Sequence, residues 1–423
     1  DEANKIKKGG IKESDYVGRR DFRKTLTFTI DPFDAKDFDD AISFQELPNE
    51  TYEVGIHIAD VSYYVKPGTA LDEEARGRGT SVYLVDRTIP MLPEELSNDL
   101  CSLVPNKDRL TMGAVFVLDK NANVKEEWYG RTVIHSQKRF TYEEAEESIK
   151  KSGTPLHKEL SILNGLAKKL TAERFAHGAI SLDQEEVKFV LDPEGVPIKV
   201  TTKVRGDSNR LIEEFMLLAN RKVAELLSPK TEKGHKPKMS DENVSLYRIH
   251  DLPSREKMED LAFFLKSLGY KVTLVDGVIP THQINKLLKS LSTGDKKSTM
   301  SDTVHRAVIR SMAKAVYSTE NIGHYGLAFK HYTHFTSPIR RYPDIIVHRL
   351  LMDHLTNKKT AKDKMHGRMR EYEVIARISS EQEKRASDAE RASIKYKQVE
   401  YMSKRVGQTF QGIISGITEW GMY

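Results

Sequence analysis

The sequence predicts a mixed α+β fold, because strand patterns crowd its first part and helical patterns fill most of the rest. A β-rich run begins at Asp21, and Tyr52–Val65 is rich in β-branched and aromatic residues. From Leu156 to about Val406, apolar residues recur mostly at helical spacing. One stretch stands out from this pattern, because five aspartates follow one strand within ten residues.

Length and composition describe a globular chain with a sizeable core. Its 423 residues suffice for one large domain or two to three ordinary ones, and 38% hydrophobic with 30% charged residues argues against disorder. A net charge of +5 is compatible with a polyanionic partner but too small to demonstrate one. No run of 18 apolar residues occurs, so no membrane span is expected. The single cysteine, Cys101, fits a reducing compartment, and we expect a cytoplasmic protein.

The expected elements follow in chain order. Residues 1–20 are charged, contain Gly9-Gly10 and predict a linker. Tyr52–Val65 predicts a core strand, in which His57 and Asp60 are expected to be hydrogen-bonded strand residues. The later elements expected are a hairpin over Met112–Ser136, a helix over Leu156–His177, a hairpin over Ala179–Val204, an amphipathic helix over Asn209–Leu227 and a basic loop over Lys230–Lys238.

The aspartate-rich stretch Thr29–Ala41 predicts a metal site. Carboxylates this close repel and raise one another's pKa unless a cation neutralises them, and only Lys36 offsets them here. Short, hard oxygen donors suit Mg²⁺ or Mn²⁺. Pro32 allows a turn after the first donor, so that the next two return on one side while Asp40 points elsewhere or bridges a second ion. The donors expected are Asp31, Asp37, Asp39 and Asp40.

Two alternatives compete with this metal site. A calcium loop fails because the EF-hand glycine and closing glutamate are absent. A solvated turn fits poorly between apolar, strand-like segments. Grouped carboxylates are what two-metal phosphodiester hydrolysis needs, although the chemistry alone does not name the reaction.

The segment Thr80–Leu103 is apolar and kinked by Pro90 and Pro93, as expected of a pocket wall. Tyr83 within it could stack on a nucleobase, which is worth about 1–3 kcal/mol. The alternative is a core tyrosine, and the local sequence favours the core.

The segment His331–Asp344 (HYTHFTSPIRRYPD) predicts a phosphate site. Its prolines are placed to start helical turns, with Ser337 as a cap. A helix N-terminus that presents Arg340 and Arg341 suits a phosphate group. An ion pair between an arginine and Asp344 explains the pattern equally well on local grounds.

Three other late features are expected to be structural. The histidines His331 and His334 lack the companions of a zinc site, so they are expected to serve structure. Glu381–Met402 predicts a charged helix with a solvent face, although Arg391 and Lys395 on one side could meet RNA. Val406–Tyr423 alternates like the opening strands of a small barrel that it is too short to close.

Taken together, these segments resemble the catalytic RNB domain of the ribonuclease II/R family, and within it the bacterial ribonuclease R branch. The resemblance runs from about Asp21 to about Val406, and its aspartate and SPIRRYPD motifs are highly specific. The motifs that carry it are TFTIDPFDAKDFDDA, YLVDRTIPMLPEELSNDLCSL, EEFMLLAN, YRIHDLP and HFTSPIRRYPD.

The resemblance implies an RNB-type α+β domain over residues 21–405, with a mixed or antiparallel sheet surrounded by helices. Residues 1–20 would be a linker from an absent N-terminal cold-shock region, and residues 406–423 the beginning of a truncated S1 RNA-binding barrel. The implied activity is processive, hydrolytic 3′→5′ degradation of single-stranded RNA to nucleoside 5′-monophosphates with Mg²⁺, for which Mn²⁺ is the alternative. A monomer is favoured.

The resemblance also implies roles for single residues. The four aspartates fall on the family's metal site, with Asp39 and Arg340 as catalytic residues. Tyr83 falls on the aromatic that stacks against the 3′-terminal base, and Arg340, with Arg341 beside it, on the grip for the scissile phosphate. Glu390 falls on an acidic residue near the terminal nucleotides. Rival readings are a catalytically weak RNA-binding scaffold, a general metal-dependent phosphodiesterase and an endonuclease.

Overall fold

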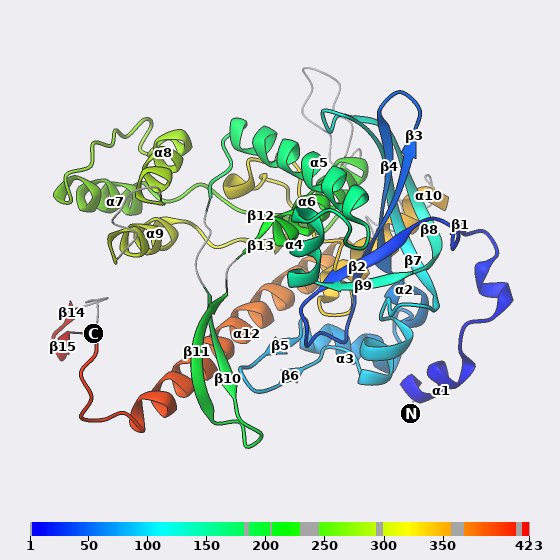
Figure 1. Cartoon of the computed structure of the whole chain (residues 1–423), viewed down its shortest axis with the longest axis horizontal. Coiled ribbons are helices and arrows are strands. Elements are labelled where there is room, and N and C mark those ends of the chain that lie inside the picture. Colours follow the sequence, from blue (N-terminus) through cyan, green and yellow to red (C-terminus); the bar gives the residue numbers. More distant parts are fainter. Residues whose placement is uncertain are drawn as a thin grey trace.

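A seven-stranded mixed sheet occupies the right half of the molecule in Figure 1 and is called the central sheet below. The computed structural model describes residues 2–181, 186–203, 205–228, 245–292, 299–356, 368–411 and 417–422. The strand order is β1-β8-β7-β4-β3-β2-β9; β1 and β9 pair in parallel with their neighbours, and the inner pairs are antiparallel. The strands are β1 (Arg20–Phe22), β2 (Thr27–Asp31), β3 (Asp40–Leu47), β4 (Thr51–Ala59), β7 (Asp108–Asp119), β8 (Val124–His135) and β9 (Lys138–Thr141). The predicted mixed α+β fold is confirmed.

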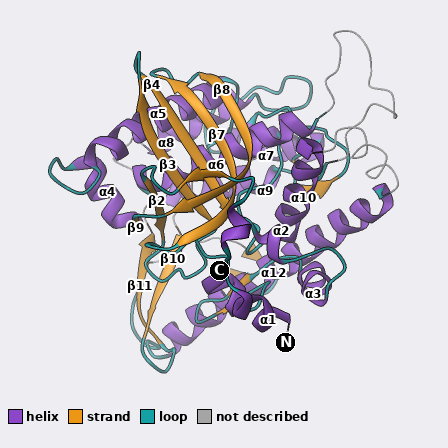
Figure 2. Ribbon diagram, turned by 90° about the vertical axis from the view of Figure 1, so that its right-hand side faces the viewer, coloured by secondary structure: helices purple, strands orange, loops and turns teal. Residues whose placement is uncertain are grey.

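Helices α4 (Tyr142–Lys150), α5 (His157–Ala176) and α6 (Asp207–Leu227) pack against one another beside this sheet (Figure 2). Every residue of β2 is buried, as expected for a strand covered on both faces. Apolar residues of α6, including Phe215 and Leu218, join the main core with β2 and β4. The first of the aspartates, Asp31, is therefore the last residue of a strand that is buried along its whole length.

Several predicted elements are confirmed. The first hairpin is β7–β8, the second is β10 (Glu186–Leu191) with β11 (Pro197–Lys203), and the two predicted helices are α5 and α6. The predicted strand Tyr52–Val65 ends early, at Ala59, because Asp60 accepts a hydrogen bond from the Tyr63 N–H (3.2 Å) and begins the short helix α2 (Val61–Tyr64). The predicted basic loop Lys230–Lys238 lies outside the described residues.

The prediction of a linker over residues 1–20 is wrong for most of that segment. Helix α1 (Glu2–Gly9) docks on the body: the Glu2 carboxylate accepts a hydrogen bond from the Leu71 N–H (3.0 Å), and Lys7 pairs with Asp99 (2.9 Å). A 3-10 turn (Glu13–Tyr16) follows, and the buried Arg19 guanidinium lies 2.8 Å from Asp60. The glycine pair does end the helix, but Ile6 and Ile11 on either side of it are half-buried against the main core.

Helices α7 (Arg255–Ser267), α8 (Thr281–Ser292) and α9 (Thr299–Ser311) form a second group with its own apolar core, at the left of Figure 1. The short antiparallel pair β12 (Tyr247–Ile249) and β13 (Val316–Ser318) leads into and out of this group.

The 35-residue helix α12 (Met369–Ser403) crosses the lower part of the molecule in Figure 1 and confirms the predicted charged helix. It contacts α10 (Tyr342–Thr356), α3 (Ala70–Arg78), β13, β5 (Val82–Tyr83) and β11. β5 forms a small hairpin with β6 (Thr88–Ile89), and a π-helical turn (Leu96–Leu100) follows. In the tail, β14 (Ile417–Thr418) pairs with β15 (Gly421–Met422), and an S1 barrel stays a prediction. Among the described residues, no helix is long and apolar enough to cross a bilayer.

Candidate active site

The aspartates gather at one end of the central sheet. Asp31 is the last residue of β2 and lies opposite Thr141 of the parallel strand β9. Asp40 is the first residue of β3, the antiparallel neighbour of β2. Asp37 and Asp39 lie on the connecting loop. The turn predicted after Asp31 therefore exists, and it returns the chain to the same sheet end.

Asp39 joins this loop to the predicted arginine segment, 300 residues further along the chain. Its Oδ1 accepts a hydrogen bond from the Ile339 N–H (2.8 Å), and its Oδ2 lies 3.7 Å from Arg340 Nε. The Asp39 side chain is 6% exposed, whereas the Arg340 side chain is 40% exposed. The arginine thus reaches a buried carboxylate and still offers part of its guanidinium to a ligand.

The two arginines have different partners: one forms the predicted ion pair, and the phosphate site stays a prediction for the other. Arg341 donates from Nε and Nη2 to the buried Asp344 carboxylate, at 3.0 and 2.8 Å. Asp344 Oδ1 also accepts from the Ser337 N–H (2.7 Å). The ion pair is therefore correct for Arg341, and Arg340 faces the aspartates. Ser337 does precede a turn over residues 338–340, and its carbonyl accepts from the Arg341 N–H (3.0 Å), whereas its hydroxyl accepts from Arg340 Nη2 (3.0 Å).

The histidines of this segment serve structure, as predicted. His331 Nδ1 lies 2.9 Å from the Ser228 hydroxyl, and His334 Nδ1 lies 2.8 Å from the Tyr317 hydroxyl. In the sheet, His57 bridges Ser43 and Thr132 through its two ring nitrogens, as predicted for a hydrogen-bonded strand residue.

Tyr83 lies beside Asp37 and not in the core. The residue is 39% exposed, and its hydroxyl donates a hydrogen bond to Asp37 Oδ2 (3.4 Å). Its backbone N–H donates to Glu390 Oε1 of α12 (3.2 Å), and the N–H of Val85, between β5 and β6, donates to the Ser393 hydroxyl (3.1 Å). The core alternative is wrong for Tyr83, and Glu390 holds its backbone in place.

Burial and mutual repulsion raise the pKa values of the aspartates. Burial, and then the neighbouring Asp40, raise the pKa of Asp31 to about 8. Burial raises the pKa of Asp40 to about 6, against the opposing effect of Arg340. Burial also raises the pKa of Asp39 well above its ordinary value, although Arg340 and the Ile339 N–H lower it. Without a bound cation, these carboxyl groups therefore hold their protons to a higher pH than free aspartates do.

The donor set fits a divalent cation, although the side chains do not form a closed cage. Asp31 Oδ2 is buried and has no hydrogen-bond partner, which is costly for a carboxylate oxygen unless a ligand satisfies it. Within the described part of the chain, no three His, Cys, Asp or Glu side chains lie close enough to hold an ion as they stand. The predicted donors thus lie at one end of the sheet, and the metal site itself stays a prediction.

Tyr142 is a neighbour of the site that the sequence did not single out. It begins α4 directly after Thr141, which lies opposite Asp31, and it is partly buried. Burial, and then Asp40 and Asp31, raise the pKa of its hydroxyl. The capping box of Thr141 and Glu144 is a sequence signal for the start of this helix. The parallel pairing of β2 with β9, which brings Tyr142 to the aspartates, cannot be predicted from the spacing of residues.

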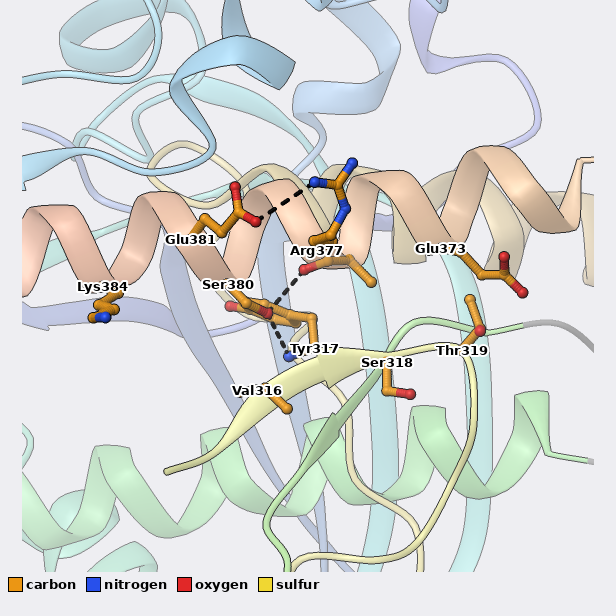
Figure 3. A pocket seen from close by; sticks show the side chains of 10 residues that line it. Val316, Tyr317, Ser318, Thr319, Glu373, Arg377, Ser380, Glu381 and Lys384 are labelled. Carbon is orange, nitrogen blue, oxygen red and sulfur yellow. Dashed lines mark hydrogen bonds and ion pairs between the residues drawn. The ribbon is translucent and has the colours of Figure 1, made fainter. Parts of the chain in front are cut away.

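Two hollows lie outside the aspartate site. A surface hollow of about 470 Å³ between β13 and α12 is lined by Arg377 and Glu381, which pair at 3.6 Å, and by Ser380, which accepts from the Tyr317 N–H (2.9 Å) (Figure 3). None of the predicted site residues lines it. A larger cavity of about 1040 Å³ lies between α12 and the α7–α9 group, and eight arginines and lysines but three acidic residues line it.

Comparisons with known proteins agree with this architecture. A family model described as "RNB domain" matches residues 19–357. The chain is 40% identical over 429 residues to Ribonuclease R of Thermotoga maritima, which covers 100% of this chain and 58% of that protein. Mycoplasma genitalium RNase R in complex with ribose methylated single-stranded RNA matches with a TM-score of 0.88 and 28% identity, over 99% of this chain and 64% of that one.

The fold also occurs in a protein described as a pseudonuclease. Yeast Ssd1 matches with a TM-score of 0.68 and 22% identity, over 91% of this chain and 45% of that one, which shows the fold alone. The chain spans less than two thirds of the length of each of these three proteins. Because the family model matches most of the chain, the predicted resemblance is confirmed, and the chain belongs to the RNB domain family.

Proposed function

We propose that this chain carries the catalytic part of a metal-dependent exoribonuclease, which hydrolyses single-stranded RNA processively from its 3′ end and releases nucleoside 5′-monophosphates. The observation that carries this proposal is the meeting of Asp39 with Ile339 and Arg340, which puts an acidic loop and a cationic turn in one site. The similarity to Ribonuclease R supports the reaction class, and the single-stranded RNA in the Mycoplasma RNase R complex supports the substrate.

Asp31, Asp37, Asp39 and Asp40 would hold the Mg²⁺ or Mn²⁺. A divalent cation bound by carboxylates lowers the pKa of bound water and offsets the charge of a phosphodiester. The buried, unpartnered Asp31 Oδ2 and the raised pKa of Asp31 are the features that a cation would relieve. No carboxylate of the site needs to act as a general base in this scheme.

Arg340 would bind the scissile phosphate. Its guanidinium is held from one side by Asp39 and by the Ser337 hydroxyl, and 40% of the side chain is exposed. A planar guanidinium can donate two parallel hydrogen bonds to phosphate oxygens, and it stabilises the charge that builds on them during displacement.

Tyr83 would receive the terminal base. Its ring is partly exposed beside Asp37, and Glu390 and Ser393 of α12 fix the backbone of its strand. Stacking on a fixed aromatic ring tolerates any base, as an enzyme without sequence preference requires. The basic cavity that α12 lines next to Glu390 would accommodate the phosphate backbone of the strand.

The direct test is incubation of 5′-labelled single-stranded RNA with the protein in Mg²⁺ and in EDTA. We expect a ladder that shortens from the 3′ end in Mg²⁺, nucleoside 5′-monophosphates as products, and no cleavage in EDTA. Internal fragments would point to an endonuclease. Equal cleavage of a matched DNA strand would point to a general phosphodiesterase, and RNA binding without cleavage to a scaffold.

A further inference from the structure

The loop that carries Asp37 and Asp39 is tied to a distant buried serine. Ser102 follows the π-helical turn and is 0% exposed. Its hydroxyl oxygen accepts a hydrogen bond from the Phe38 N–H (3.0 Å) and donates one to the Lys36 carbonyl (2.7 Å). Both hydrogen-bonding capacities of the hydroxyl are thus used on the backbone of the acidic loop.

These bonds hold the backbone of Phe38, the residue between Asp37 and Asp39. Asp37 and Asp39 leave the chain on either side of Phe38, and the Phe38 carbonyl accepts a further bond from the Leu103 N–H (3.0 Å). The Asp39 carbonyl accepts from the Ala59 N–H of β4 (2.9 Å). The loop is therefore clamped between the sheet and the segment that contains Ser102.

That segment is itself held rigidly. The guanidinium of Arg109, a residue that is 6% exposed, donates from Nε to the Ser102 carbonyl (2.8 Å) and from Nη2 to the Asp99 carbonyl (3.1 Å). Arg109 lies on β7, in the middle of the central sheet. The sheet thus reaches the acidic loop by a second route, from Arg109 through Ser102.

We propose that Ser102 is a positioning residue, which sets the spacing of Asp37 and Asp39 for a divalent cation. This inference rests on the proposed function and names a residue that touches neither the cation nor RNA. Without the hydroxyl, the buried Phe38 N–H loses its acceptor and the loop loses its tie between residues 36 and 38. Loss of an outer hydrogen-bond partner of this kind typically weakens metal affinity about 10- to 100-fold.

The test compares Ser102→Ala with Ser97→Ala in the same protein. Ser97 is a matched control, because it is also buried in the same segment and its hydroxyl, among the described residues, donates a hydrogen bond only to the Asn98 side chain (3.4 Å). Two Mg²⁺ midpoints are measured for each variant: the dissociation constant fitted to the dependence of Tm on Mg²⁺ concentration, and the Mg²⁺ concentration that gives half-maximal RNA hydrolysis. We expect both midpoints to rise about tenfold in Ser102→Ala and to stay at the wild-type value in Ser97→Ala.

A merely structural role would lower the Tm in EDTA and leave the Mg²⁺ midpoint unchanged, and that result would overturn the inference. If Ser102→Ala does not fold, Ser102→Cys keeps the side-chain size with a weak acceptor, and the same rise in midpoint is expected. Failure of the proposed function is recognised separately, because wild-type protein would then cleave no RNA in Mg²⁺. A wild-type Mg²⁺ response that Ser102→Ala matches overturns this inference alone.

Discussion

The replacement Asp31→Asn should stabilise the metal-free protein, and more strongly as the pH rises. Burial, and then Asp40, raise the pKa of Asp31 from 3.8 to about 8. The folded protein therefore keeps a proton here that the unfolded chain has released, so its stability falls as the pH rises between about 4 and 8. Asparagine carries no charge and escapes this cost.

Linkage gives the size of the effect. With the folded pKa at about 8, the upper limit of the cost is about 2 kcal/mol at pH 5 and about 5 kcal/mol at pH 8. The advantage of Asp31→Asn in free energy of unfolding should thus grow by up to about 3 kcal/mol between these two values. The assay is denaturant unfolding in EDTA at pH 5, 6.5 and 8.

Asp34→Asn serves as the matched control, because Asp34 lies on the same loop and is exposed. It should leave the free energy of unfolding within about 0.5 kcal/mol of wild type at each pH. At pH 8, Mg²⁺ should stabilise wild type more than Asp31→Asn, since a ligand stabilises the form that binds it. An Asp31→Asn protein that is less stable than wild type at pH 8, or whose advantage does not change with pH, would refute the reasoning.

Four further outcomes are expected. Asp39→Asn keeps an acceptor for the Ile339 N–H but loses the charge, so RNA hydrolysis should fall at least about 10²-fold, while RNA affinity in a gel-shift assay changes little; equal loss of binding would contradict this. Arg340→Ala should lower kcat about 10²- to 10³-fold, with partial recovery in Arg340→Lys, and an unchanged kcat would remove Arg340 from the reaction. Tyr83→Ala should change the length of the final undegraded product on a sequencing gel, and an unchanged product would argue against a base contact. EDTA should abolish hydrolysis and added Mg²⁺ or Mn²⁺ should restore it, whereas persistent cleavage in EDTA would exclude the metal scheme.

Local sequence patterns predicted most of the helices and strands, but not where some of them end or which distant residues they contact. The β7–β8 hairpin and helices α5 and α6 follow from periodicity and turn residues, which act over a few positions. The strand from Tyr52 was predicted too long, because its end depends on Asp60, whose cap outweighs the β-branched residues that follow. The first helix was missed because charge and paired glycines indicate a linker, while its contacts with Leu71 and Asp99 lie far along the chain.

The site divides in the same way. The aspartate cluster and the arginine pair were predicted from their chemistry, whereas the choice between Arg340 and Arg341 depended on where Asp344 lies in the folded turn. Tyr83 was expected in the core on local grounds, and only the family resemblance placed it in the site. Its contact with Glu390 spans 307 positions, a distance over which spacing carries no information.

Helix α12 holds several distant parts of the molecule through contacts along its length. It is about 52 Å long at 1.5 Å per residue, and along it Glu383 pairs with Arg248, Glu390 holds Tyr83, and Lys397 reaches the β10–β11 hairpin at Gly195. One residue inserted after Glu383 would rotate everything beyond it by about 100°. Tyr83 would then lose its hydrogen bond to Glu390 although no residue of the site had been replaced. Substitutions in α12 should therefore be tolerated far more readily than a change in its length.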